Sequence, residues 1–346
     1  LNAAVWRYHP VRHEFEIFAH GTSNPWGLDF NAQGDFFISA CVIPHFYHIV
    51  QGGRYIRQAG QHFNPHTYGE IGTIADHSHY AGNIRDHAHW GNKPAAPTDT
   101  SALGGGHAHC GLAIYQAEEF PPAYRGHAFF HNLHGHRIVR EFLEPAGSSY
   151  LARHRPDFLL THNHDFVGVG VMQGPDGALY LSDWVDSQTC HHRSVEAWDR
   201  GNGRIFRVRH GSAKPYRFDL ASEGEAQLVA RLADPNAYYA RQAQRILQER
   251  AAGGTLDRKS LATALRAFDA QQAGDLTLRL RSLWTRHVTG LLEDPALVAL
   301  LQDPAPHVRG WAVQFLGERR QAVSSQALTA LGQLAGSEPS LVTRRY

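Results

Sequence analysis

Short runs of alternating apolar and polar residues, separated by glycine and proline, dominate the first part of the chain. Three such runs follow one another at 110–115, 128–133 and 137–142, and each is rich in β-branched or aromatic residues. This pattern predicts three short strands. The Phe120–Gly126 link is too long for a two-residue turn, and its two prolines favour a rigid corner. Successive strands this close in sequence form a meander, which is the form of one propeller blade.

The same pattern recurs on both sides of this stretch. Trp26–Phe30 with Phe36–Ser39, and Gly170–Met172 with Leu179–Ser182, repeat two apolar runs around a glycine turn. The further strands predicted around these copies are Val5–Tyr8, 45–50, 137–142 and 204–208. Self-similarity of this kind is typical of propellers, so we expect residues 1–210 to form a partial β-propeller whose first blades precede this chain.

Apolar residues after Arg209 instead recur every three to four positions, as in Leu261, Leu265 and Phe268. This spacing predicts amphipathic helices. The frequency of histidine falls at the same point, because 23 of the 25 histidines lie before residue 211. We therefore expect a domain boundary between residues 210 and 211.

The helical part also contains a repeat. Asp234-Pro235 is matched 69 residues later by Asp303-Pro304, and Glu338-Pro339 follows after another 35 residues. Helix pairs at this period are typical of HEAT-like arrays, so residues 211–346 are predicted to form a HEAT-like α-solenoid. Each Asp-Pro is expected to supply the N-cap and the first-turn proline of the helix that follows it.

The predicted propeller contains one long inserted loop, at residues 52–106. It is rich in glycine, proline and histidine and poor in aliphatic residues. Structureless connections longer than about 15 residues are uncommon in compact domains and are often functional. Aromatic residues from Tyr55 to Trp90 indicate a packed excursion, whereas 93–106 is expected to be its most mobile part.

Composition excludes several classes of protein. The formal charge of +1 on 346 residues gives no reason to expect nucleic-acid binding. No run of eighteen apolar residues is present, so no membrane span is predicted. The three cysteines contain no C-x-x-C pair, which argues against a disulfide scaffold, a zinc ribbon or an attached c-type haem.

Histidine pairs provide the candidate chemistry. The six close pairs are His77/His79, His87/His89, His107/His109, His134/His136, His162/His164 and His191/His192. Two imidazoles at i and i+2 on a strand point to one face, where they could bind a metal. His77, His79, His107 and His109 are therefore predicted metal ligands. The alternative is that these loop histidines only hydrogen-bond to their own backbone.

The central opening of the predicted propeller is the expected catalytic site. His107 and His109 lead directly into an inner strand, and Asn24 precedes the corresponding strand of an earlier copy. We expect Asn24, His107 and His109 to orient a substrate there, with one imidazole moving a proton.

Several motifs resemble a known family. Ser23–Leu28, Gly111–Gly126 and Gly174–Tyr180 resemble the later blades of the glucose/sorbosone dehydrogenase propellers, in the right order and over residues 5–209. Trp198–Ile205 looks more closely like the membrane-bound dehydrogenases in which such a propeller precedes HEAT-like repeats and often a c-type haem domain.

This resemblance implies a six-bladed quinoprotein-type propeller that uses pyrroloquinoline quinone (PQQ) and calcium to oxidise a sugar or alcohol. It also implies a periplasmic or secreted location and a c-type cytochrome as electron acceptor. The substrate-side asparagine of the family corresponds to Asn24, and its cofactor-contacting lysine falls near His134. Its paired arginines fall near Val167 and Val169, where a tricarboxylated quinone would need cations.

Two other functions stay open. One is a histidine-ligated copper or haem redox site at the propeller axis. The other is a non-catalytic scaffold that binds a glycan or a protein partner, the latter through the HEAT-like repeats.

Overall fold

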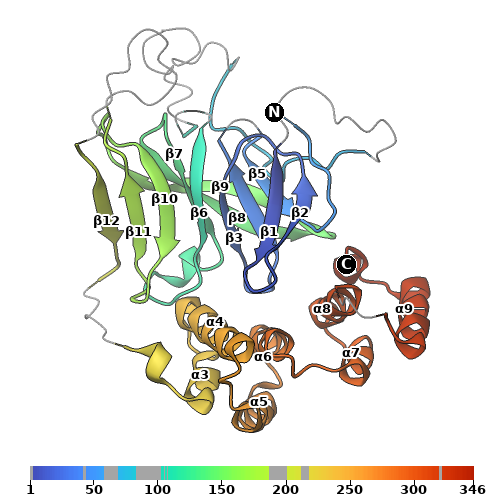
Figure 1. The fold of residues 1–346 in the computed structure, drawn as a ribbon. Coiled ribbons are helices and arrows are strands. Elements are labelled where there is room, and N and C mark those ends of the chain that lie inside the picture. The colour runs from blue at the N-terminus through green and yellow to red at the C-terminus, as the bar shows by residue number, and fades with distance from the viewer. Residues whose placement is uncertain are drawn as a thin grey trace. The chain divides into compact units, whose positions relative to one another are not determined.

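The chain divides into a β-rich unit and an α-helical unit (Figure 1). The computed structural model describes residues 3–41, 44–57, 69–82, 103–104, 106, 108–186, 201–211, 218–318 and 322–346. The first unit comprises residues 1–145 and 150–213, and the second comprises 146–149 and 214–346. His107 and most of the long inserted loop lie outside the described residues.

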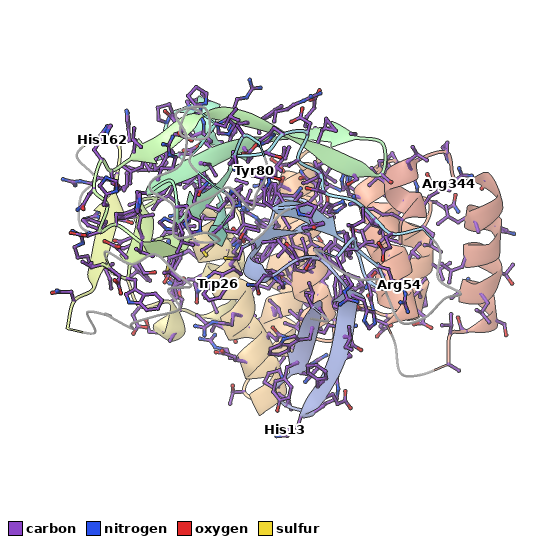
Figure 2. All side chains as sticks on the ribbon, turned by 90° about the horizontal axis from the view of Figure 1, so that it is seen from above. His13, Trp26, Arg54, Tyr80, His162 and Arg344 are labelled. Carbon is purple, nitrogen blue, oxygen red and sulfur yellow. The ribbon has the colours of Figure 1, made fainter. Side chains whose placement is uncertain are left out.

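The first unit consists of consecutive β-meanders, each ordered as in the chain. A hairpin of β1 (Ala4–His9) and β2 (Glu14–His20) comes first, with His13 at its tip (Figure 2). The next sheet contains β3 (Pro25–Phe30), β4 (Phe36–Ala40) and β5 (Phe46–Ile49). The third contains β6 (His109–Ile114), β7 (Ala128–Asn132), β8 (Arg137–Ala146) and β9 (Ser149–Leu160). The last contains β10 (Gly168–Gln173), β11 (Leu179–Asp183) and β12 (Arg204–Val208).

The β6–β9 sheet is buried on both of its faces. On one face, Val139 packs in a core with Phe37 and Phe46 of the preceding sheet. On the other face, Ile138 packs with Leu179 and the other apolar residues of the following sheet. Because successive strand residues point to opposite faces, an apolar pair such as Ile138-Val139 fills both layers at once. The three sheets therefore form consecutive packed layers.

The first strands of these three sheets approach one another closely. A Cβ added to Gly27 in β3 would lie 2.3 Å from the backbone carbon of Gly111 in β6. Gly111 has a φ of +66° and approaches the backbone of β10 in the same way. Ser39 Oγ donates a hydrogen bond of 2.8 Å to the Gly111 carbonyl, and the Ile114 amide donates one of 2.7 Å to Asp29. The first strands of the three sheets are therefore in direct backbone contact.

The described part of the second unit contains eight α-helices. They are α3 (Glu225–Arg231), α4 (Ala237–Gly253), α5 (Arg258–Gln272), α6 (Leu276–Val288), α7 (Asp294–Leu300), α8 (Pro306–Gly317), α9 (Ser325–Ser337) and α10 (Leu341–Arg344). Leu228, Leu247 and Leu265 belong to one apolar core, and Leu297, Leu316 and Ala327 belong to another. None of these helices combines the length and hydrophobicity that a bilayer crossing requires.

The prediction that Asp234 and Asp303 are helix N-caps is wrong, because each lies two residues before the actual N-cap. Asn236, not Asp234, caps α4, and α8 begins at Pro306 after Ala305. Asp234 instead accepts a hydrogen bond from the amide two residues later, and Asp303 does the same. The carboxylate therefore closes a turn before the helix, because its nearest available donor is the i+2 amide of that turn.

Candidate metal centre

Three histidines and one glutamate converge in the first unit. One possible ligand atom from each of His45, His77, His79 and Glu141 lies within 4.8 Å of all the others. His45 directly precedes β5, and Glu141 lies in β8. Imidazole and carboxylate groups are common ligands of transition metals in proteins.

The segment that carries His77 and His79 is held between two strands. The Ile74 amide donates a hydrogen bond of 3.0 Å to the Phe46 carbonyl, and the Ala152 amide donates one of 2.8 Å to the Ile74 carbonyl. Ala75 also forms a parallel bridge with Ala152 of β9. Residues distant in the sequence are thereby fixed next to one another.

Glu141 is at the centre of the polar network. Its Oε1 lies 3.0 Å from His77 Nε2, 3.1 Å from His79 Nε2 and 3.2 Å from His154 Nδ1. The other ring nitrogen of His79 lies 2.7 Å from Nε2 of His109. His109 is the first residue of β6. The network thus combines residues of β6, β8 and β9 with the segment that carries His77 and His79.

Four residues of the network are almost entirely removed from solvent, whereas His77 and His154 are half-buried. His109 and Glu141 are 0% exposed, His79 is 1% exposed and His45 is 2% exposed. Within the part of the chain that the structure describes, His45 Nε2 and Glu141 Oε2 have no hydrogen-bond partner. Buried polar atoms are nearly always satisfied, so two unsatisfied ligand atoms in one cluster point to a bound group.

The ionisation states of His45, His79 and Glu141 suit a metal, whereas His77 would have to lose a proton to bind one. Burial holds the pKa of His45 well below its usual range and also lowers the pKa of His79. Burial opposes ionisation of Glu141, but hydrogen bonds from His154, His77 and His79 outweigh it and hold the carboxyl pKa well below its ordinary value. For His77, burial is outweighed by Glu141 and Asp76, and its pKa is raised. Neutral imidazoles and an ionised carboxylate are the forms that bind metal ions.

Comparison with known proteins gives the family of the first unit. A family model described as a domain of unknown function (DUF7133) matches residues 1–212. The chain belongs to this family. A comparison with curated proteins gave no match.

Solved structures of sugar dehydrogenases also match the DUF7133 chain. One, described as an oxidoreductase (glucose dehydrogenase) from Thermus thermophilus, is 20% identical over 56% of this chain and 47% of its own, with a TM-score of 0.34. Another, the apo form of the soluble aldose sugar dehydrogenase from Escherichia coli, is 16% identical over 50% of this chain and 44% of its own, with a TM-score of 0.33. The chain spans less than half of the length of either structure.

The structure brings three of the predicted site residues together. His77 and His79 lie in the cluster with His45 and Glu141, and His109 contacts His79. Asn24 is exposed, and its side chain makes no hydrogen bond with the described residues. His107 lies outside those residues, and half-buried His134 lies next to Gly106.

Three residues of the network are absent from the sequence-based prediction: His45, Glu141 and His154. Glu141 had a recognisable signal, because it occupies the same face of β8 as buried Val139 and Leu143. A carboxylate at an inward strand position requires a partner.

The DUF7133 chain does not fit PQQ at the positions that correspond to the paired arginines of the dehydrogenase family. Val167 is 0% exposed and packs against Ala108, Cys110 and Leu133. The carboxylates of the quinone would meet an apolar core at Val167, and the valine itself supplies no charge to neutralise them.

Proposed function

We propose that His45, His77, His79 and Glu141 bind one divalent transition-metal ion and that this ion is the redox centre of an oxidoreductase. The convergence of four ligand atoms within 4.8 Å, three of them on buried residues, carries this proposal. Three imidazoles and one carboxylate suit copper, zinc or iron, but zinc has no redox chemistry, and copper(II) binds such ligands more strongly than iron(II). We therefore assign copper.

His109 and His154 are the positioning residues of this centre. His109 contacts the ring nitrogen of His79 that points away from Glu141, so it fixes the orientation of that imidazole. His154 contacts the same Glu141 oxygen as His77 and His79. Such outer partners raise the metal affinity of the ligands that they hold.

Copper is favoured over haem by the number of ligands. Haem already supplies four nitrogens to its iron, so a protein adds at most two axial ligands. Four donors from one small cluster suit a free ion. A sugar or alcohol substrate, a cytochrome acceptor and a periplasmic or secreted location stay predictions from the family resemblance.

Metal binding by the intact chain tests the proposal. The chain is stripped with a chelator and titrated with Cu²⁺, and bound metal is measured by mass spectrometry. We expect one tightly bound ion per chain and an electron paramagnetic resonance (EPR) signal with nitrogen hyperfine splitting. Ascorbate should abolish that signal and air should restore it, because the ion cycles between two oxidation states.

Matched variants locate the ion. His79→Gln and Glu141→Gln should weaken copper binding by more than about 10- to 100-fold, the range that the loss of an outer partner alone causes, because each replaces a direct ligand. His210→Gln removes an exposed histidine of the same unit and should leave the tight site unchanged. Equal affinity in all three variants, or no tight site in the unmodified chain, would show that the cluster is not a metal centre.

A further inference from the structure

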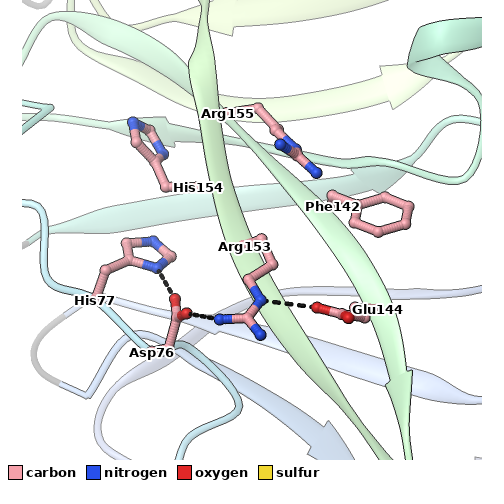
Figure 3. A pocket seen from close by; sticks show the side chains of 7 residues that line it. All are labelled: Asp76, His77, Phe142, Glu144, Arg153, His154 and Arg155. Carbon is pink, nitrogen blue, oxygen red and sulfur yellow. Dashed lines mark hydrogen bonds and ion pairs between the residues drawn. The ribbon is translucent and has the colours of Figure 1, made fainter.

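A cavity of about 480 Å³ opens beside the metal cluster (Figure 3). It is lined by Asp76, His77, Phe142, Glu144, Arg153, His154 and Arg155. His77 is one of the proposed metal ligands, and its side chain is 19% exposed. A ligand in this cavity would therefore lie against the metal centre, and the volume is sufficient for a small molecule.

Most charges of the cavity wall neutralise one another. Arg153 forms ion pairs with Asp76 and with Glu144, the latter at 2.7 Å, as the dashed lines of Figure 3 show. Asp76 also lies 2.8 Å from Nδ1 of His77. Both carboxylates of the wall are thus occupied by Arg153 and His77.

Arg155 differs from Arg153 in its surroundings. Its guanidinium carbon lies 5.3 Å from the centre of the Phe142 ring. Among the residues that the structure describes, no carboxylate pairs with Arg155, and its side chain is exposed. An arginine held over an aromatic ring keeps its N–H donors available, and its planar fork matches the two oxygens of a carboxylate.

We propose that this cavity binds the carboxylate of a small hydroxy acid, with Arg155 as its anchor and a hydroxyl group directed toward the metal. The inference rests on the proposed function, because the metal sets the charge balance. A divalent ion and ionised Glu141 leave one positive charge, whereas the four charged residues of the wall cancel. One carboxylate makes the loaded site neutral, but a phosphate dianion would leave excess negative charge beside Asp76 and Glu144.

Calorimetric titration of the intact, zinc-loaded chain tests this assignment, because zinc avoids redox side reactions. The probe is D-glucuronate, and D-glucose is its uncharged counterpart. We expect D-glucuronate to bind at least tenfold more tightly than D-glucose or phosphate. Arg155→Gln should weaken D-glucuronate binding at least tenfold without changing the metal content. The D-glucuronate affinity of Arg155→Lys should lie between that of Arg155→Gln and that of the unmodified chain.

Arg125→Gln is the matched control, since it removes an exposed arginine of the same unit that does not line the cavity. Equal D-glucuronate affinity in the Arg155→Gln variant, or preferential binding of glucose or phosphate, would overturn the proposal. If the chain takes up no metal, the proposed function fails by itself. The metal-free chain is then titrated, and weak binding that depends on Arg155 supports the anchor, whereas no such binding refutes it.

Discussion

Glu141 shows why a single residue decides the character of this site. Its neighbours on the same face of β8, Val139 and Leu143, are buried among apolar side chains. An ionised carboxylate in such surroundings loses several kcal/mol of hydration free energy, which only opposite charge and hydrogen bonds can offset. Three histidine nitrogens contact Oε1, and Oε2 has no partner among the described residues. The cation of the proposed metal site would complete this balance.

His131 gives a prediction on pH. It lies in β7, and its Nε2 donates a hydrogen bond of 3.0 Å to the Gly170 carbonyl. Burial lowers its pKa to about 4, from about 6.5 in the unfolded chain. As the pH falls, His131 is protonated in the unfolded chain before it is protonated in the folded chain, and this favours unfolding. The free energy of unfolding is therefore not reduced by His131 above pH 6.5, and it falls by up to about 3 kcal/mol as the pH drops to about 4.

A comparison with His131→Gln isolates this effect, because Gln can still donate to Gly170 but does not titrate. The free energy of unfolding is measured by urea denaturation between pH 7.5 and 4. The stability advantage of the unmodified chain over the variant should shrink as the pH falls. A difference that stays constant across this range would contradict the low pKa of His131.

At the scale of elements, the β8–β9 hairpin supplies both parts of the proposed site. β8 carries Glu141 on its inward face, and β9 carries His154 and Arg155. The hairpin thus provides a metal ligand and a cavity wall in one piece of secondary structure. The parallel bridge between Ala75 and Ala152 then adds the segment that bears His77 and His79.

Gly27 tests the packing of the inner strands. An added Cβ would lie 2.3 to 2.6 Å from backbone atoms of Gly111 and Leu112, which cannot move as a side chain can. Gly27→Ala should therefore lower the free energy of unfolding by at least about 3 kcal/mol. Gly69→Ala is the control, since no atom of the described residues beyond its chain neighbours lies within 4 Å of its added Cβ. Similar stability of both variants in denaturant titration would show that β3 and β6 do not require this close approach.

The strands differ in how well the sequence predicts them. β7, β11 and β12 are evident from alternating or aromatic runs between turn residues. β9 was not predicted, because Arg153, His154, Arg155 and Pro156 interrupt any apolar alternation. His154 was missed with it. The spacing of His77 and His79 could suggest a metal, but which distant carboxylate faces them depends on sheet packing, which one sequence does not encode locally.

At the scale of the molecule, each unit has its own apolar cores. Those of the β unit include Phe130 and Leu181, whereas Leu247 and Leu265 belong to the α unit. A domain with a separate core can unfold cooperatively by itself. The proposed metal site lies in the β unit alone, so an ion bound there should stabilise only one of the two cooperative units.

Calorimetry of the intact chain should therefore show two unfolding transitions that respond to different changes. Copper at a hundredfold excess over its dissociation constant should stabilise the β unit by about 2.7 kcal/mol and raise one transition only. Leu265→Ala removes a fully buried side chain from the α unit and should lower the other transition, by about 2 to 5 kcal/mol in stability. A single transition that shifts with both the metal and the variant would show that the units unfold together, and the separate cores would then not act as independent cooperative units.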